Sequence, residues 1–483
     1  MFQAKLLIGG QEVSAQGDAT YDRLDPITER VATRAASATV GDAVEAANSA
    51  AAAFPVWSTS SAAERTAILS EAADRLLERS DEFVAVMAEE TGAAESWARF
   101  NCQLGADMLR HAAGLTDRLE EIEIASAQSG VRAWAVRQPA GVVLAIAPWN
   151  APVVLGARAV AVALACANTV VLKASEICPR THAMIAETLN AAGLPAGALN
   201  LVTNAPEKAP DVIEALIAHA AVRRVSFTGS TRVGRTIADL CARHLKPCLL
   251  ELSGKAPLLV LDDADIEEAV KAAAFGAFFN QGQVCISTER LIVDKAVADR
   301  FVSALAARAA GLRAGDPRSG GQPLGSMISR EAVHRIAGLI DDATAKGARL
   351  VAGGQGEGTI MQPTVLDGVT SNMRVYHEES FGPLVAIMRV DGADEAVAVA
   401  NDSEYGLAAS VFGRDIERAR AVARRIETGI CHVNGPTVYD EPQMPFGGMK
   451  ASGYGRFGGD AGVQEFTELR WLSVHETAHD YPF

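Results

Sequence analysis

Cys285 is the cysteine whose surroundings in the sequence best suit a chemical role. It follows the polar, glycine-containing segment 279–284, where a helix is expected to end and a side chain can face a cleft. A thiol with a pKa of about 8.5 reacts at neutral pH only when a base or donor dipoles lie nearby. Cys166, Cys248 and Cys431 lie within apolar runs and are expected to be structural. On these grounds Cys285 is the candidate nucleophile, and the alternative of another structural cysteine stays open.

Two further polar side chains stand at or after strand ends, where open α/β sheets bind ligands. Glu251 lies near the end of the strand expected at 248–252, and Asn150 follows the strand expected at 142–147. A carboxylate in this position can act as a general base, and an amide can donate to an oxyanion. A solvated strand-end glutamate and a turn-forming asparagine are the structural alternatives.

These residues are set in alternating strand and helix patterns, which predict a doubly wound parallel sheet with helices on both faces. The runs lie at 142–147, 155–167, 169–173, 180–192, 199–202, 212–219, 225–228, 234–244 and 248–252. A second α/β alternation occupies 257–261, 266–279, 290–293 and 299–310. Residues 40–119 are expected to be helical, 131–137 to form an extended hairpin, and 445–460 to be mostly loop.

No G-x-G-x-x-G segment follows a strand and opens a helix, so the usual dinucleotide fingerprint is absent. Instead, segment 227–234 joins a strand to a helix and offers backbone amides and a helix N-terminus to a pyrophosphate. An ordinary helix cap at Ser230 or Thr231 is the alternative. The glycine-rich run 353–358 precedes no helix and is expected to be a surface loop.

The composition is that of a globular protein with about three domains, since the chain has 483 residues and is 49% hydrophobic. The net charge of -15 argues against a nucleic acid partner, and the apolar stretches are too short to span a membrane. The N-terminus lacks the apolar core of a signal peptide, and the seven cysteines include no C-x-x-C pair. We therefore expect a cytoplasmic protein with reduced thiols.

Seven motifs, taken in order, resemble those of the aldehyde dehydrogenase superfamily, and the match spans essentially the whole chain. They are APWN at 147–150, KASE at 173–176, FTGS at 227–230, ELSGK at 251–255, GQVC at 282–285, EESFGP at 378–383 and PFGG at 445–448. The resemblance implies that Cys285 attacks an aldehyde to form a thiohemiacetal and then a thioester. Asn150 and the Cys285 backbone amide would stabilise the oxyanion, and Glu251 would activate the water that hydrolyses the thioester.

The resemblance also implies NAD as cofactor, with Lys173 and Glu176 at the adenosine ribose, Ser230 at the pyrophosphate, and Glu379 with Phe381 at the nicotinamide ribose. A carboxylate at Glu176 accepts a hydrogen bond from the ribose 2′-hydroxyl and repels a 2′-phosphate, which favours NAD over NADP. No metal is expected. The complete expected set of cofactor contacts is Ala147, Pro148, Trp149, Lys173, Ser175, Glu176, Phe227, Gly229, Ser230, Val233, Leu252, Glu379 and Phe381.

The fold implied by the resemblance has three parts. Residues 1–117 and 138–250 form a Rossmann-like NAD-binding domain, 251–449 an α/β catalytic domain, and 118–137 with 450–483 a β-hairpin oligomerisation arm and tail. Such a hairpin exposes strand edges in a monomer, so a homodimer or a homotetramer is expected.

Within the superfamily, segments 287–290, 433–441 and 454–459 are most similar to salicylaldehyde and vanillin dehydrogenases, which implies a small aromatic aldehyde as substrate. The expected substrate channel is lined by Trp97, Trp149, Arg158, Val284, Ile286 and Tyr439. Arg158 would pair with a phenolate or hydroxyl on the ring, or serve as a structural ion-pair partner.

Three alternatives stay open at this stage. In a semialdehyde or aliphatic aldehyde dehydrogenase, Arg158 would bind a distal carboxylate. A CoA-acylating enzyme would dispense with the hydrolytic base Glu251. A catalytically idle binding relative is opposed by the joint presence of Cys285, Glu251 and Asn150.

Three positions depart from the common family pattern. Ser253 replaces the first glycine of the usual E-L-G-G-K and is expected to restrict the swing of Glu251 without abolishing activity. Ala159 and Phe457 stand where many members carry a lysine and a glutamate that take the proton away from the general base. The resemblance therefore implies that water or another route serves here.

Overall fold

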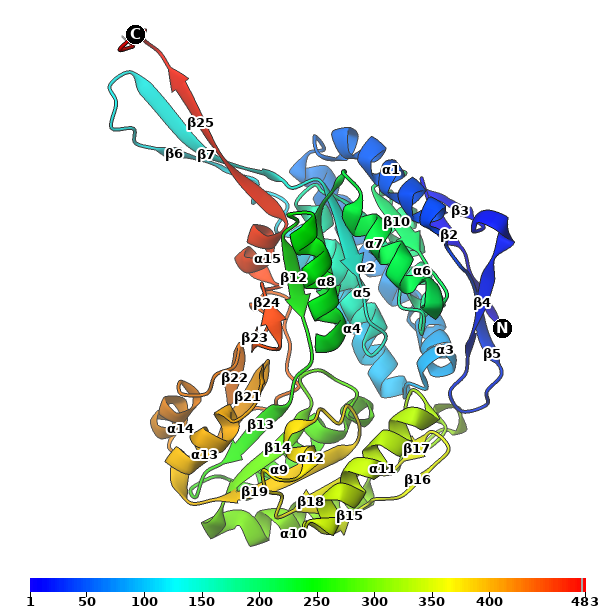
Figure 1. Cartoon of the computed structure of the whole chain (residues 1–483), viewed down its shortest axis with the longest axis vertical. Helices are drawn as coiled ribbons and strands as arrows, with labels where there is room; N and C mark the ends of the chain where they lie inside the picture. The colour runs from blue at the N-terminus through cyan, green and yellow to red at the C-terminus, as the bar shows by residue number, and fades with distance from the viewer. Residues whose placement is uncertain (479–480) are drawn as a thin grey trace.

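The computed structural model describes residues 1–478 and 481–483. Its N-terminal part begins with short strands, and four helices follow (Figure 1). The helices confirm the helical pattern seen in the sequence; the strands before them were not predicted, because runs of three to six residues carry little periodicity. The elements are β1 (Phe2–Ala4), β2 (Leu6–Ile8), β3 (Gln11–Val13), β4 (Thr20–Leu24), β5 (Val31–Ala36), α1 (Val40–Trp57), α2 (Ala62–Glu78), α3 (Ser80–Thr91) and α4 (Glu95–Ala113), with a 3₁₀ turn at Gln16–Asp18.

The first large sheet has the strand order β24-β12-β11-β8-β9-β10-β2-β3. Its central strands run parallel, and helices cover both faces, with α1, α7 and α8 in one core and α2, α4, α5 and α6 in the other. The elements not yet given are β8 (Val142–Ile146), α5 (Pro152–Ala165), β9 (Thr169–Lys173), α6 (Pro179–Ala191), β10 (Leu199–Val202), a 3₁₀ turn (Pro206–Lys208), α7 (Ala209–Ala218), β11 (Val222–Thr228), α8 (Thr231–Arg243), β12 (Cys248–Glu251) and β24 (Gly453–Tyr454). The doubly wound prediction is confirmed, with one correction: β2, β3 and β24 pair antiparallel at the edges.

The second large sheet has the order β15-β18-β19-β14-β13-β21-β22 and is parallel except between β15 and β18. Figure 1 shows it below the first sheet, with α11 and α13 among its flanking helices. Its elements are β13 (Ala256–Val260), α9 (Ile266–Phe278), a 3₁₀ turn (Phe279–Gly282), β14 (Thr288–Asp294), α10 (Lys295–Gly311), a 3₁₀ turn (Pro317–Ser319), α11 (Arg330–Ala345), β15 (Arg349–Ala352), β18 (Thr364–Asp367), α12 (Arg374–His377), β19 (Leu384–Val390), α13 (Gly392–Asn401), β21 (Ala408–Phe412), α14 (Ile416–Ala423) and β22 (Ile430–Val433).

The glycine-rich run 353–358 is not entirely a loop, because β16 (Gly356–Glu357) pairs with β17 (Ile360–Met361) in a small hairpin. A second pair of short strands, β20 (Tyr405–Gly406) and β23 (Met449–Lys450), lies near the C-terminal part of the chain, followed by α15 (Gly459–Glu465). Strands of two residues have no recognisable period, which is why the sequence predicted loop at 353–358 and at 445–460.

An arm of three antiparallel strands projects from the body (Figure 1), in the order β25-β7-β6. It consists of β6 (Glu121–Ile124), β7 (Val131–Pro139) and β25 (Thr467–His475). The predicted hairpin at 131–137 is confirmed, since β6 pairs antiparallel with β7, and β25 pairs with β7 along its whole length.

The seven cysteines are free, as expected. Cys166 is buried, while Cys248 and Cys431 are half-buried and pack against the edge of a hydrophobic core, in keeping with a structural role. Cys248 begins its strand and Cys431 lies on the edge strand β22, where one side of the strand has no neighbour. Within the part of the chain that the structure describes, no helix combines the length and hydropathy needed to cross a bilayer.

Candidate active site

The carboxyl ends of three neighbouring strands in the first sheet bring polar residues together. In the order β12-β11-β8, Glu251 ends β12, Gly229 and Ser230 follow β11, and Asn150 follows β8. Because parallel strands end at one edge, these residues meet although they are far apart in the sequence.

Cys285 comes to the same place from the second sheet, in a strained loop between α9 and β14. Asn280, Gln281 and Gly282 have φ values of 50°, 55° and 69°, a conformation that L side chains rarely adopt. A Cβ on Gly282 would lie 2.1 Å from the Gly382 carbonyl oxygen, so only glycine fits. Strain of this kind persists only where the surroundings fix it.

Buried amide side chains fix this loop. Gln281 accepts from the Gly325 N–H (3.0 Å) and donates to the Ser326 carbonyl (3.1 Å). Gln283 Oε1 accepts from the Ile328 N–H (2.9 Å). Sequence reasoning did not identify these amides as positioning groups; the signal was the polar run at 280–283 inside an otherwise apolar stretch.

Asn150 lies against the Cys285 loop. The side-chain Nδ2 of Asn150 donates to the backbone carbonyl of Gln283 (3.1 Å). The backbone carbonyl of Asn150 accepts from Trp97 Nε1 and Asn280 Nδ2 (3.0 Å each). The asparagine is buried, so its amide is held in one place beside the thiol-bearing loop. A fixed N–H donor is what stabilisation of an oxyanion requires.

Glu251 and Cys285 share an environment that disfavours charge. Glu251 is 1% exposed, and neither of its carboxylate oxygens has a hydrogen-bond partner among the described residues. Burial raises the pKa of Glu251 to about 7, opposed by the nearby Cys285 thiol and Arg158 guanidinium. Burial and the Glu251 charge raise the pKa of Cys285 well above its usual value. The thiol is therefore protonated at rest, with a carboxylate of suitable basicity beside it.

One cavity, of about 250 Å³, lies on the first-sheet side of Cys285. It is lined by Pro148, Trp149, Asn150, Thr228, Gly229, Ser230, Glu251, Leu252, Ser253, Cys285, Glu379 and Phe381. The Trp149 and Phe381 rings meet edge to face, with centroids 5.7 Å apart. Ser230 caps α8 by accepting from the Val233 N–H (3.4 Å). This helix N-terminus beside the cavity suits a pyrophosphate.

Seven of the thirteen expected cofactor residues line this cavity, and six do not: Ala147, Lys173, Ser175, Glu176, Phe227 and Val233. Lys173, at the end of β9, pairs with Glu176, whose Oε1 also accepts from Asn204 Nδ2 (3.2 Å). Asn204 Oδ1 is buried without a partner among the described residues. The carboxylate and this free acceptor suit the hydroxyl groups of a ribose, so the residues present fit a dinucleotide.

A buried ion pair positions Glu379 and Phe381. Lys255 Nζ binds Glu289 Oε2 (2.6 Å), and Glu289 accepts from the backbone N–H groups of Ser380 (2.7 Å) and Phe381 (3.0 Å). Both charged residues stand within motif segments, but the sequence gives no sign that they pair, because a contact across 34 residues leaves no periodic signal.

The Ser253 hydroxyl acts against the burial that raises the pKa of the Glu379 carboxyl group. Burial, followed by the charge of Glu289, raises the pKa of Glu379 to about 7, while the Ser253 hydroxyl and the Gly254 N–H (3.1 Å) oppose the rise. The serine that replaces the usual glycine therefore favours the ionised form of a neighbouring carboxyl group. The expected restriction of Glu251 stays a prediction.

A second cavity, of about 260 Å³, shares Cys285 and Asn150 with the first. Apolar and aromatic side chains make up most of its wall, whose residues are Trp97, Phe100, Leu104, Asn150, Ala151, Val154, Leu155, Arg158, Phe275, Val284, Cys285, Ile286, Pro436, Val438, Tyr439, Asp440 and Phe446. Five of the six residues expected in the substrate channel lie here. The sixth, Trp149, lines the first cavity instead, because its ring packs against Phe381.

Arg158 forms a buried ion pair with Asp440, so the structural alternative for this arginine is present. Phe457 is one of the departures from the family pattern. Its side chain is buried, and its ring centroid lies 5.7 Å from the guanidinium carbon of Arg158. Ala159 is buried as well. Neither position can carry a proton.

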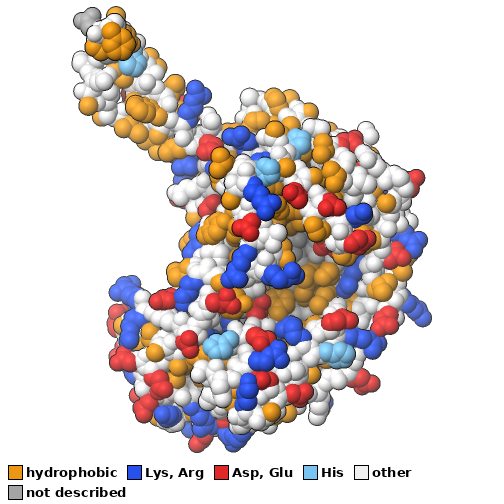
Figure 2. All heavy atoms as spheres, viewed as in Figure 1, with side chains coloured by type: hydrophobic (Ala, Val, Ile, Leu, Met, Phe, Trp, Pro, Cys, Tyr) orange, Lys and Arg blue, Asp and Glu red, His pale blue; other side chains and the backbone are white. Residues whose placement is uncertain are grey.

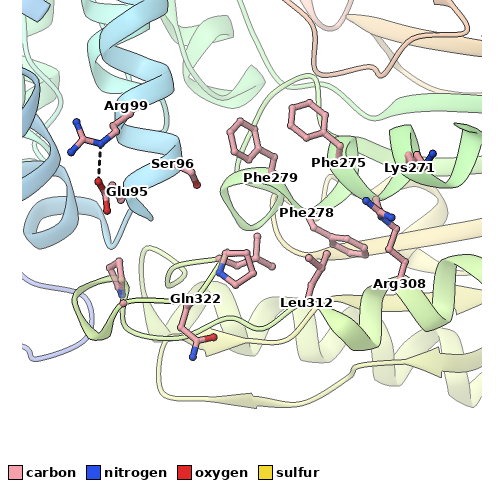
Figure 3. Close-up of a pocket in the computed structure, with 16 residues that line it drawn as sticks. Glu95, Ser96, Arg99, Lys271, Phe275, Phe278, Phe279, Arg308, Leu312 and Gln322 are labelled. Atoms are coloured by element: carbon pink, nitrogen blue, oxygen red, sulfur yellow. Dashed lines mark hydrogen bonds and ion pairs between the residues drawn. The ribbon is translucent and has the colours of Figure 1, made fainter.

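A third, larger cavity has a volume of about 670 Å³. Figure 3 shows residues that line it. The Phe275 and Phe279 rings stack 4.8 Å apart at its wall, and Lys271 and Arg308 lie beside them. Because Phe275 lines this cavity and the second one, the two adjoin. Figure 2 shows a hollow with hydrophobic side chains between the upper and lower parts of the molecule.

Among the described residues, no cluster of histidine, cysteine or carboxylate side chains could hold a metal ion. The donor set of the site is instead a thiol, an amide and carboxyl groups, arranged where two cavities meet.

Comparison with known proteins gives consistent results. The sequence model of the aldehyde dehydrogenase family matches residues 13–472. The chain is 57% identical to a vanillin dehydrogenase from Pseudomonas sp. (strain HR199 / DSM 7063), over the full length of both chains. A crystal structure of a salicylaldehyde dehydrogenase from Pseudomonas putida G7 complexed with salicylaldehyde superposes with a TM-score of 0.98 and 46% identity, over 100% of both chains. PnpE in complex with nicotinamide adenine dinucleotide gives 0.95 and 36%, over 100% of this chain and 99% of that one.

Proposed function

Because this chain belongs to the aldehyde dehydrogenase family, we propose that it oxidises small aromatic aldehydes to carboxylic acids with NAD. The observation that carries the proposal is the second cavity, whose ring-rich wall ends at the Cys285 thiol. Aromatic side chains pack well against an aromatic substrate. The vanillin and salicylaldehyde dehydrogenases that resemble this chain support the same substrate class.

Cys285 is the nucleophile in this proposal. Glu251 accepts the thiol proton, and the sulfur attacks the carbonyl carbon to form a thiohemiacetal. The Asn150 amide donates to the developing oxyanion. The residues that line the first cavity would hold NAD, which would supply the acceptor for the hydride that leaves the thiohemiacetal carbon. Loss of that hydride leaves a thioester on Cys285.

Hydrolysis of the thioester completes the reaction. Glu251 first releases the thiol proton to solvent and then removes a proton from water. The hydroxide oxygen bonds to the acyl carbon, and the carbon–sulfur bond breaks to release the acid and the Cys285 thiolate. A carboxyl group with a pKa of about 7 is suited to this role near neutral pH. A CoA-acylating enzyme has no use for such a base.

The semialdehyde alternative needs a free cation to bind a distal carboxylate. Arg158 is the cation in the substrate cavity, and Asp440 already neutralises it. An anionic substrate would have to displace this carboxylate in a buried place, which is costly. An aromatic substrate is favoured for this reason.

NAD is the favoured cofactor over NADP because Glu176 would face the ribose 2′-hydroxyl. Replacing Glu176 with glutamine removes the negative charge that repels a 2′-phosphate, so kcat/KM with NADP should rise relative to NAD by about tenfold. Unchanged cofactor preference in Glu176→Gln would contradict this role.

The three domain ranges given above, a cytoplasmic location and a homodimer or homotetramer belong to the same proposal. The seven free thiols support a reducing compartment. The exposed arm supports assembly, since its outer strands have unpaired edges.

The test is steady-state kcat/KM, measured by NADH absorbance, for salicylaldehyde, vanillin, benzaldehyde, succinic semialdehyde and propanal. We expect the aromatic aldehydes to lead by tenfold or more, about 1.4 kcal/mol of transition-state preference. A lead for succinic semialdehyde or propanal would overturn the aromatic assignment and leave the family membership intact.

A further inference from the structure

The ion pair between Arg158 and Asp440 is the charged feature in the wall of an otherwise largely apolar cavity. Arg158 Nη2 binds Asp440 Oδ2, and the two side chains are 7% and 11% exposed. The guanidinium carbon also lies 4.2 Å from the centroid of the Phe446 ring. The cation is therefore held by the carboxylate on one side and by an aromatic face on another.

The second carboxylate oxygen of Asp440 does not take part in the ion pair with Arg158. Oδ1 is buried and has no hydrogen-bond partner among the described residues. A buried acceptor without a donor costs free energy, and such groups in folded proteins call for an explanation. Asp440 lines the same cavity as Cys285 and Asn150, so a molecule bound against the thiol can reach it.

We propose that Asp440 Oδ1 accepts a hydrogen bond from a hydroxyl group on the ring of the aldehyde, and so selects hydroxylated over unsubstituted aromatic aldehydes. The inference rests on the proposed function and names the subsite that sets its specificity. Asp440 contacts the substrate in this proposal, and Arg158 is a positioning residue that holds the carboxylate in place.

The hydrogen-bonding chemistry of the Asp440 carboxylate restricts which ring substituents it can bind. A carboxylate paired with arginine accepts hydrogen bonds and donates none. A ring hydroxyl supplies the missing donor, whereas a ring methoxy group has no hydrogen to give and a phenolate adds a second negative charge. Sites built to bind a substrate hydroxyl discriminate strongly against analogues that lack it.

The experiment compares kcat/KM for benzaldehyde, the three hydroxybenzaldehydes and their methoxy counterparts. In the unmodified enzyme we expect one hydroxybenzaldehyde to exceed benzaldehyde and its own methoxy counterpart by at least about tenfold. The ratio between substrates is the readout, since a purely structural role for the ion pair would change all substrates together.

Two variants separate the roles. The double variant R158M/D440L replaces a buried ion pair with apolar side chains of similar volume, a change that proteins often tolerate. In it, the hydroxyl preference should fall to within about threefold. In Asp440→Asn, the amide oxygen faces Arg158 and the Nδ2 donor faces the cavity. The kcat/KM of the methoxybenzaldehyde should therefore rise relative to that of the hydroxybenzaldehyde.

A matched control is Asp22→Asn, because Asp22 also pairs with an arginine, Arg34, and lies outside the second cavity. Its substituent preference should match that of the unmodified enzyme. Thermal unfolding of each variant shows whether it has folded.

The outcomes are distinguishable. Equal rates for benzaldehyde and every hydroxybenzaldehyde, or a preference that survives in R158M/D440L, would overturn the role of Asp440 and leave the proposed function standing. A preference that grows as pH ionises the ring hydroxyl would assign the ring oxygen to Arg158 and overturn it as well. If no aromatic aldehyde is oxidised, the proposed function itself fails.

Discussion

Glu251 and Cys285 depend on each other for their protonation states at the residue scale. Each lies in an environment that disfavours its charged form, and the charge of Glu251 raises the pKa of Cys285 further. Transfer of the thiol proton to Glu251 keeps a single negative charge in the pair, and that charge moves to the oxyanion when sulfur bonds to carbon.

The first prediction concerns pH. The pKa of Glu251 is raised to about 7, so its basic form is present above pH 7 and is lost as pH falls through 7. We expect kcat to rise with pH to a plateau with an apparent pKa near 7, measured with benzaldehyde and saturating NAD. A midpoint near the ordinary glutamate value of about 4.3 would show that Glu251 is not the limiting base.

The second prediction concerns Asn150. Removing one donor to an oxyanion typically costs about 10²–10³ in kcat, so Asn150→Ala should lose activity on this scale. Its amide also donates to the Gln283 carbonyl, and the loss of that bond should lower stability by only about 1 kcal/mol. Comparison of kcat with the free energy of unfolding separates the two effects; a variant with full activity would exclude Asn150 from the oxyanion site.

The motifs that carry the family resemblance single out the proposed reacting residues but not the residues that position them. Cys285, Glu251 and Asn150 stand at motif positions that the sequence displays directly. Gln281 and Glu289 act through hydrogen bonds to segments about 45 and 91 residues away, and a single sequence contains no record of such pairs. The free oxygen of Asp440 is evident only when its neighbours are known.

At the scale of elements, two sheets contribute to one site. The carboxyl edge of the first sheet supplies Asn150 and Glu251, and the loop before β14 in the second sheet supplies Cys285. Periodicity predicted the central strands well because they are buried on both faces and read as continuous apolar runs. It did not predict the left-handed turn at 280–282, since a glutamine such as Gln281 rarely adopts that conformation.

The third prediction belongs to this turn. Gly282→Ala should lower kcat/KM and the stability together, because the new Cβ would lie 2.1 Å from the Gly382 carbonyl oxygen. Gly368→Ala is the matched control, since Gly368 also has a positive φ of 74° but a Cβ added there would meet nothing within 4 Å. In both variants the positive φ of alanine should lower the free energy of unfolding by about 1–2 kcal/mol. Only the Gly282 variant should lose more than this, because of the close contact. Equal stability loss in the two variants, by chemical denaturation, would contradict the tight packing of the turn.

At the scale of the whole molecule, the projecting arm exposes apolar side chains that no other described part of the chain covers. Trp471 is 81% exposed, and Ile122, Ile124, Leu469, Leu472 and Val474 of the same sheet are exposed too. Apolar groups that cluster on a projecting sheet usually mark an interface between proteins. The sequence predicted an extended hairpin at 131–137 as part of the arm, and we propose that a second copy of the chain covers its apolar side chains.

The fourth prediction concerns assembly. Replacing Leu469 and Trp471 with serine should shift the protein toward monomer, measured by light scattering after size-exclusion chromatography. The unmodified chain should elute as a dimer or tetramer. A monomeric unmodified chain at micromolar concentration would contradict the role of the arm.

The proposed function depends above all on one step, in which an aromatic aldehyde becomes an acyl group on Cys285. Glu251→Gln keeps the shape of the side chain and removes the base of both steps. Acylation should slow but continue at alkaline pH, because the charge of Glu251 no longer raises the pKa of Cys285. Hydrolysis has no base in this variant, so the thioester should accumulate. The decisive experiment is the intact mass of this variant after reaction with benzaldehyde and NAD, followed by peptide mapping. We expect a benzoyl group on Cys285 together with one equivalent of NADH. Sustained NADH formation by this variant without an adduct, or an adduct on another residue, would contradict the mechanism.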